Sequence, residues 1–150
     1  MVSILLVNAA ISTALFALGW RIANRIGDPS FIDSWWALGI VVLAACTFVQ
    51  VPPSAHALVL FVLTTAWGLR LGLYLLRRWL DHGKDRRYAA LESSARGKHR
   101  LSFSAFAALW VFAPQMALQF AVALPAMAGM LTERSALGWL AWAGLILAAA

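Results

Sequence analysis

The residues best suited to chemistry lie in one run of the sequence, WGLRLGLYLLRRWLDHGKDRRY, which spans residues 67–88. The run begins in an apolar segment that carries an arginine, Arg70, and it ends in closely spaced basic residues. A charged side chain at bilayer depth costs roughly 2.5–3.5 kcal/mol on insertion scales, and it usually faces a bundle interior or a water-filled cavity. We therefore expect the functional groups to lie around Arg70 and the basic residues that follow it.

Arg70 shares one face of its predicted helix with Trp67, Tyr74 and Arg77, at spacings of three and four residues. The two glycines at positions 68 and 72 fall on the opposite face. This small-residue pattern lets another helix approach closely. One interpretation is a pocket for an anionic ligand or substrate, with Trp67 and Tyr74 on its wall. The other is that Arg70 snorkels to the interface, or pairs structurally, and has no further role.

The segment 77–100 holds eight Lys and Arg residues against three acidic residues, a local net charge of +5. Such side chains bind the phosphates of nucleotides through charge-assisted hydrogen bonds. Within the segment, Asp85, Arg86, Arg87 and Tyr88 interleave acid, base and aromatic, unlike a plain polybasic run. Membrane topology alone requires the same charges, and anionic lipid headgroups attract them. The charge pattern leaves both interpretations open.

Two glutamines, Gln115 and Gln119, lie one helical turn apart in a later apolar segment. Pro114 precedes them and removes a backbone hydrogen bond, which predicts a kink there. The two amides can line a polar cavity as part of a substrate pocket. They can also bond to a neighbouring helix, a contact worth about 0.6 kcal/mol on average, and we favour this structural interpretation.

The three histidines, His56, His82 and His99, are scattered and have no metal-ligand spacing. We therefore predict no metal site. The sequence contains no glycine-rich phosphate loop, no Gly-x-Ser-x-Gly elbow and no His-Glu-x-x-His motif. The residue types alone do not name a reaction.

The composition is that of an integral membrane protein: 63% of the residues are hydrophobic and 12% are charged, against about 25% charged in a soluble domain. The single cysteine, Cys46, excludes an internal disulfide framework. The formal net charge is +6. We exclude a nucleic-acid partner, because the basic residues flank apolar segments, as membrane topology requires.

We expect all-α architecture, a polytopic transmembrane helix bundle in a single membrane domain over residues 1–150, because a span in lipid must satisfy its own backbone hydrogen bonds. Four full spans and a fifth incomplete one are predicted. The last segment has 16 residues, or ~24 Å of helix against a ~30 Å hydrocarbon core. It ends without a polar flank, so we expect the sequence to be cut off within a helix. The segments are 3–20, 34–51, 54–76, 102–130 and 135–150.

Ten of the twelve Lys and Arg residues lie in the first and third connections between these segments. An up-and-down path places those connections on one side of the membrane, and the positive-inside rule makes that side cytoplasmic. We therefore predict a multi-pass protein whose N-terminus is outside and whose basic loop, 77–101, is cytoplasmic.

The same runs carry a resemblance to a known family. WGLRLGLYLLRRWLDHGKDRRYAAL, followed by LWVFAPQMALQFAVALPAMAG, resembles the bacterial domain-of-unknown-function branch of the steroid 5-alpha-reductase superfamily. Its members share an Asp-x-x-Trp, a Trp-Gly-x-Arg-Leu span, a Glu/Asp-x-Arg-Tyr loop and a Gln before a Leu-Pro. The resemblance covers about residues 28–150. The matching positions are Asp33 and Trp36, residues 67–71, Asp85 with Arg87 and Tyr88, and a glutamine before Leu124 and Pro125.

The resemblance implies a parent chain nearly twice as long, in a bacterial inner membrane. Its second half carries an Arg-His-Pro-x-Tyr-type motif and most of the groups that hold NADPH. No Arg-His-Pro occurs in this sequence. We therefore expect it to correspond to the N-terminal half, from a truncated reading frame or a partial gene, and to be inactive alone.

The superfamily reduces an activated carbon–carbon double bond by hydride transfer. The resemblance thus implies NADPH-dependent reduction of a lipid-soluble enone, with a pocket that includes Gln115 and Gln119 beside the aromatic residues. The alternatives are S-adenosylmethionine-dependent methyl transfer in the membrane and a non-enzymatic fragment or helical interaction partner. Expected partners are membrane lipid, a hydrophobic small molecule, and a separately encoded C-terminal half or a second copy of the chain. The residues expected at the cofactor are Arg70, Asp85, Arg86, Arg87 and Tyr88.

Overall fold

The structure, a computed structural model, describes residues 1–132 and Gly138. Over these residues the chain is helical and has no strand, which confirms the predicted all-α class. The predicted last segment, 135–150, lies outside the described residues except for Gly138. The elements are α1 (Val2–Ile26), α2 (Ile32–Phe48), α3 (Ala55–His82), α4 (Arg86–His99), α5 (Phe103–Phe106), the π-helix η1 (Ala107–Phe112) and α6 (Ala113–Met130).

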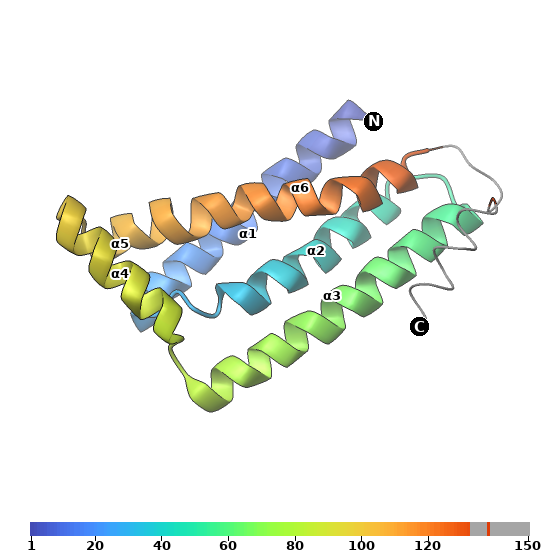
Figure 1. Ribbon diagram of the computed structural model, residues 1–150. Helices are drawn as coiled ribbons and strands as arrows, with labels where there is room; N and C mark the ends of the chain where they lie inside the picture. Colours follow the sequence, from blue (N-terminus) through green and yellow to red (C-terminus); the bar gives the residue numbers. More distant parts are fainter. Residues whose placement is uncertain (133–137, 139–150) are drawn as a thin grey trace.

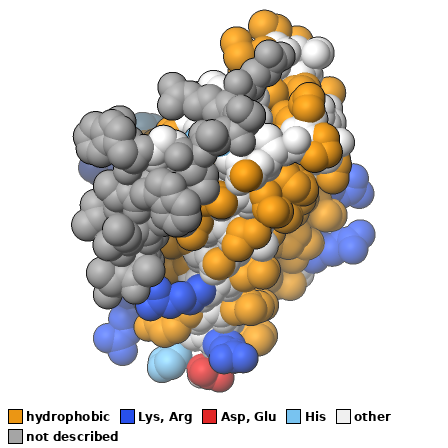
Figure 2. Space-filling model, turned by 90° about the vertical axis from the view of Figure 1, so that its right-hand side faces the viewer, with side chains coloured by type: hydrophobic (Ala, Val, Ile, Leu, Met, Phe, Trp, Pro, Cys, Tyr) orange, Lys and Arg blue, Asp and Glu red, His pale blue; other side chains and the backbone are white. Residues whose placement is uncertain are grey.

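The four long helices run side by side as an up-and-down bundle, and α4 crosses one end of it at a steep angle (Figure 1). Helix α2 packs against α1, α3 and α6 and is therefore the central element. Its neighbours bury their small and apolar residues against it. Apolar side chains cover most of the described surface visible in Figure 2, with charged side chains at its lower end and along its right-hand edge.

By length and composition, three helical stretches can cross a membrane: Val2–Ile26, Ala55–His82 and the continuous stretch Phe103–Met130. The count of four full spans stays a prediction, because the apolar helix α2 has only 17 residues, or ~26 Å of helix. It ends at Phe48, three residues short of the predicted boundary, and the prolines at 52–53 follow soon after. Proline and the residue before it disfavour helical backbone, so α2 cannot extend across that point.

The connection that we predicted as a basic loop, 77–101, is largely helical. Helix α3 continues through its first residues to His82, and α4 contains Arg86–His99. No helix breaker precedes Gly83, whose φ of 68° is the left-handed backbone that glycine adopts readily. The segment therefore consists of two helices joined by a short turn, and its basic side chains are held on ordered backbone.

The two glycines in 68–72 let α3 lie directly on α2. A Cβ added at Gly68 would lie 2.6 Å from Val41 Cγ2 and 3.1 Å from the backbone oxygen of Ala37. A Cβ at Gly72 would lie 2.7 Å from Leu38 Cδ2. The predicted close helix contact is thus confirmed, and it leaves the opposite face of α3 for the residues around Arg70.

Pro114 is accommodated by the π-helical turn that precedes it rather than by a simple break. Proline has no amide hydrogen, and its ring clashes with the carbonyl four residues earlier. The wider turn over Ala107–Phe112 lets the amide of Ala113 donate to the carbonyl of Ala108, five residues back. The helix then continues as α6, with Pro114 in its first turn.

The first and third connections meet at one end of the bundle, as the up-and-down path predicts. The indole Nε1–H of Trp79 donates to Asp28 Oδ2 (2.9 Å), and the amide of Asp85 donates to Ser30 Oγ (3.2 Å). Phe31 packs edge-on against Trp79, with ring centroids 5.8 Å apart. Polar bonds and aromatic packing together fix the end of α3 against the start of α2.

Candidate functional site

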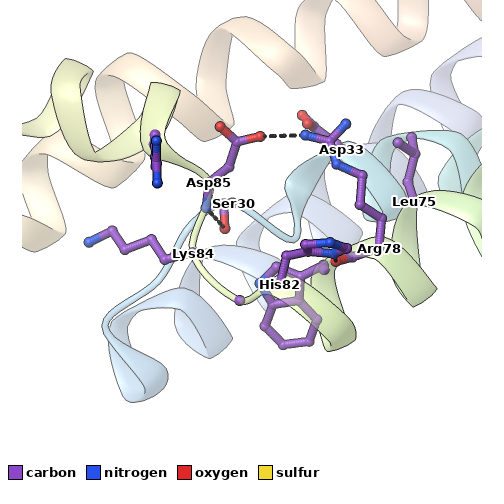
Figure 3. Close-up of a pocket in the computed structure, with 10 residues that line it drawn as sticks. Ser30, Asp33, Leu75, Arg78, His82, Lys84 and Asp85 are labelled. Carbon is purple, nitrogen blue, oxygen red and sulfur yellow. Dashed lines mark hydrogen bonds and ion pairs between the residues drawn. The ribbon is translucent and has the colours of Figure 1, made fainter.

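A cavity of about 430 Å³ lies at this end of the bundle, where α2 begins, α3 ends and α4 begins (Figure 3). Its volume falls within the roughly 300–1,000 Å³ of small-molecule sites. Cations, carboxylates and an indole share its wall, so it is chemically the richest cavity in the described part of the chain. Its lining residues are Ser30, Asp33, Leu75, Arg78, Trp79, His82, Gly83, Lys84, Asp85 and Arg86.

Asp85 joins the end of α3 to the start of α4. As the N-cap of α4, its carboxylate accepts from the amide of Arg87 (2.9 Å). It also pairs with the guanidinium groups of Arg87 and Arg78, each at 2.9 Å. The side-chain and backbone hydrogen bonds from Arg87 lower the pKa of Asp85 to about 2. Asp85 is therefore ionised at physiological pH and holds both arginines in place.

Asp33, in the first turn of α2, binds the start of α4 from the other side. Its carboxylate accepts from the Tyr88 hydroxyl (2.6 Å) and from Arg87 Nη2 (3.1 Å). Tyr88 is buried. That burial, reinforced by the bond to Asp33, raises the pKa of the Tyr88 hydroxyl well above its usual range. Tyr88 therefore stays protonated and acts as a hydrogen-bond donor.

Arg87 bridges the two carboxylates, and its pKa is raised chiefly by the side-chain hydrogen bond to Asp85. Its side chain is 68% exposed, so each of its ion pairs contributes little to stability on its own. Its main consequence is geometric, because Arg87 and Tyr88 together place the carboxylate of Asp33 beside the cavity.

Glu92, on α4, forms ion pairs with two cations. Its Oε2 lies 2.8 Å from Lys84 Nζ in the preceding turn, and its Oε1 lies 2.7 Å from Arg96 Nη1. Burial alone would raise the pKa of Glu92, but the hydrogen bonds from the two cations outweigh it and lower the pKa. Arg86 differs from these cations: it lines the cavity, is exposed, and has no ion-pair partner among the described residues. It is therefore the cation best placed to bind an incoming anion.

Two further cavities adjoin along the face of α3 that carries Trp67 and Arg70. They measure about 620 and 610 Å³, and Trp67 and Arg70 line both of them. The first adds Tyr74 and Arg77, so the four residues predicted to share a face do so. The second extends between α3 and α6 and is apolar except for Thr64 and Arg70. Its other lining residues are Ile40, Leu63, Ala66, Val122, Ala123 and Ala126.

The glutamines occupy a different place. Gln119 is fully buried, donates from Nε2 to the carbonyl of Trp36 (2.9 Å) and accepts at Oε1 from Ser12 Oγ (3.1 Å). It thereby joins α1, α2 and α6. Gln115 lies one turn earlier and is half-buried. Neither residue lines the three cavities described above.

The link from Asp33 to α4 was missed by sequence reasoning. A usable signal was present. The up-and-down path places the first and third connections at one end, so the acids of one must face the cations of the other. Asp28 and Ser30, whose side chains bond to Trp79 and to the amide of Asp85, follow from the same reasoning.

Comparison with known proteins gives one match. A family model described as "Protein of unknown function (DUF1295)" matches residues 19–149, which is most of the chain. No curated protein and no solved structure matches the sequence.

Proposed function

Because the chain belongs to the DUF1295 family, a steroid 5-alpha-reductase-like family, we propose that it serves in the NADPH-linked reduction of a lipid-soluble enone. The observation that carries this proposal is the adjacency of two unlike sites on α3. A polar cavity with basic residues lies at its end. Along its side, the two adjoining cavities that Trp67 and Arg70 line form a groove, which is mostly apolar between α3 and α6. The first suits a water-soluble cofactor and the second suits a substrate from the bilayer.

The residues of the polar cavity fit a phosphate-bearing cofactor. Arg78, Lys84 and Arg86 line it and are suitable phosphate ligands. The carboxylates on the same wall, Asp33 and Asp85, already accept hydrogen bonds from the protein, which reduces their repulsion of an anion. When bound, NADPH supplies a hydride. In this proposal the basic side chains hold its phosphates, and Asp85 and Tyr88 keep α4 in position.

The groove supports the substrate half of the proposal. Trp67 and Arg77 lie on one face of α3, about ten residues or ~15 Å apart along the helix, so the groove leads from the bilayer toward the basic end. Its apolar wall between α3 and α6 matches a hydrophobic small molecule. A lipid-soluble substrate can then enter from the membrane while the cofactor enters from water.

The cofactor half of the proposal requires the basic end to face the cytoplasm of a bacterium, with the N-terminus outside. The charge asymmetry between connections supports this orientation. In a Cys46→Ser background, a cysteine at Gly97 should be shielded from an impermeant thiol reagent in intact cells, and one at Thr132 should react. Position 97 accepts a side chain, because nothing lies within 4 Å of a Cβ there. The reverse labelling pattern would contradict the orientation.

The cofactor is tested by thermal protection of the purified full chain in detergent. NADPH is expected to raise the unfolding temperature, because a ligand that binds only the folded state stabilises it by mass action. S-adenosylmethionine and NADH serve as comparison ligands at equal concentration. Protection by S-adenosylmethionine instead would favour methyl transfer. Protection by none of them would favour a non-enzymatic role and overturn the proposal.

A further inference from the structure

The place of Arg70 on the wall of the apolar cavity favours a role beyond snorkelling. Side chains in an α-helix tilt toward its N-terminus, and α3 begins at Ala55, opposite the basic end. Arg70 accordingly shares the wall of the apolar cavity with Leu63 and Thr64, which lie up to two turns toward that N-terminus. Arg70 therefore borders both the apolar cavity and the cavity that extends toward the charged end of the bundle.

Arg70 also lacks an anionic partner in the part of the chain that the structure describes. It takes part in none of the ion pairs or side-chain hydrogen bonds there. Among residues 1–132, no Asp or Glu lines either of its two cavities. Asp85 at the basic end is bound to Arg78 and Arg87, and Asp81, on the same helix as Arg70, lies eleven residues or ~16 Å further along it. An arginine at membrane depth is costly, and such residues usually pair with another group or face a water-filled cavity.

The size and lining of the groove indicate what brings that anion. Cavities of about 620 and 610 Å³ match small ligands. Next to Arg70 the wall is apolar and formed by α2, α3 and α6, through residues such as Ile40, Leu63 and Val122. A ligand that fits both features has one anionic group and an apolar body. A planar guanidinium binds a carboxylate in two places at once, which a lysine cannot do.

We propose that the Arg70 groove binds a small single-chain amphiphile, with its carboxylate on Arg70 and its apolar part between α3 and α6. That this molecule is the enone substrate rests on the proposed function, whereas the binding itself does not. The proposal narrows the substrate class from any lipid-soluble enone to one that bears an acidic group.

The test uses the purified full chain in discs of neutral phosphatidylcholine. The probe is dibromostearic acid, whose bromines quench tryptophan fluorescence, and Trp67 lines both cavities. The matched neutral probe is dibromostearyl alcohol. We expect saturable quenching by the acid, at least about tenfold weaker binding of the alcohol, and loss of most of the saturable quenching in Trp67→Phe. Equal binding of acid and alcohol would overturn the proposal, and this comparison needs no arginine variant.

Arginine variants then test whether Arg70 binds the carboxylate of the probe. Arg70→Gln should weaken binding of the acid by about tenfold or more, the usual loss for a hydrogen bond to a charged group. Arg70→Lys should weaken it less. Arg25→Gln makes the same substitution at an exposed arginine outside these cavities and should leave binding unchanged. Equal affinities in Arg70→Gln and Arg25→Gln would leave Arg70 only an interfacial role.

One further measurement distinguishes the amphiphile from bilayer phospholipid as the occupant of the groove. A second one separates the amphiphile site from the proposed reductase function. If discs containing phosphatidylglycerol abolish binding of the acid, the groove is a site for bilayer phospholipid and the proposed ligand class is wrong. NADPH protection is measured on the same preparations. Binding of the acid without NADPH protection would support the amphiphile site and contradict the reductase role. NADPH protection without selective binding of the acid would support the reductase role and contradict the amphiphile site.

Discussion

Replacing Gly68 by leucine is expected to force α3 away from α2 and to destabilise the bundle strongly. The added Cβ alone would lie 2.6 Å from Val41 Cγ2 and 3.1 Å from the backbone oxygen of Ala37. A backbone atom of a central helix cannot move without disturbing its own hydrogen bonds. Overpacking costs about 1–3 kcal/mol and occasionally more, and we expect Gly68→Leu at or above the upper end.

The loss is measured by denaturation in detergent, followed by tryptophan fluorescence. Gly97→Leu provides the control, because it makes the same substitution on a helix where nothing lies within 4 Å of a Cβ. That variant should lose no stability, because leucine exceeds glycine in helix propensity by up to about 1 kcal/mol. If the two variants lost the same stability, the close contact between α2 and α3 would not be the cause.

Removing the hydroxyl of Tyr88 is expected to loosen α4 from the bundle. This hydroxyl donates to Asp33 at 2.6 Å from a buried ring. A hydrogen bond to a charged group contributes about 1.5–3 kcal/mol, and because 29% of the Asp33 side chain is exposed, we expect the lower end for Tyr88→Phe. Faster amide hydrogen exchange confined to α4 should accompany the loss of stability.

The sequence contains a matched control, since Tyr74 is its only other tyrosine and is 64% exposed. Tyr74→Phe should leave both stability and exchange unchanged. Combining Tyr88→Phe with Asp33→Asn should cost less than the sum of the two single changes, because the two residues share one bond. Strict additivity would show that the bond contributes nothing measurable.

The sequence predicted the features that depend on local composition. Apolar runs located α1, α3 and the stretch that ends at Met130. The glycine spacing on α3 predicted its contact with α2, and the basic connections predicted that they meet at one end. Each of these follows from a property of neighbouring residues or from a rule about membrane insertion.

Helix ends in the basic region could not be read from hydropathy. An apolar run ends where charge begins, at Arg77, whereas α3 ends only at His82. The difference arises because a helix can continue into water once its backbone hydrogen bonds are formed. Asp85 also caps α4, because its side chain accepts a hydrogen bond from a backbone amide in the first turn. A count of charged residues does not predict that role.

The partners of individual side chains required tertiary structure. Asp33 and Tyr88 are 55 positions apart, so no local pattern could join them. Gln119 had two open interpretations because membrane depth does not specify a neighbour, and its bonds to Ser12 and Trp36 place it between helices. Arg70 was placed on the correct face because its aromatic neighbours obey helical spacing.

The most direct test of the proposed function is a titration of the full chain in lipid discs with NADPH, followed by energy transfer from tryptophan, since Trp79 lines the polar cavity. Arg86→Gln removes the cavity cation that has no ion-pair partner among the described residues, and Arg25→Gln is its control outside the cavity. We expect saturable binding that weakens by about tenfold or more in Arg86→Gln and is unchanged in Arg25→Gln. Equal affinity in all three proteins, or no saturable binding by the unmodified chain, would contradict a cofactor site at this end of the bundle.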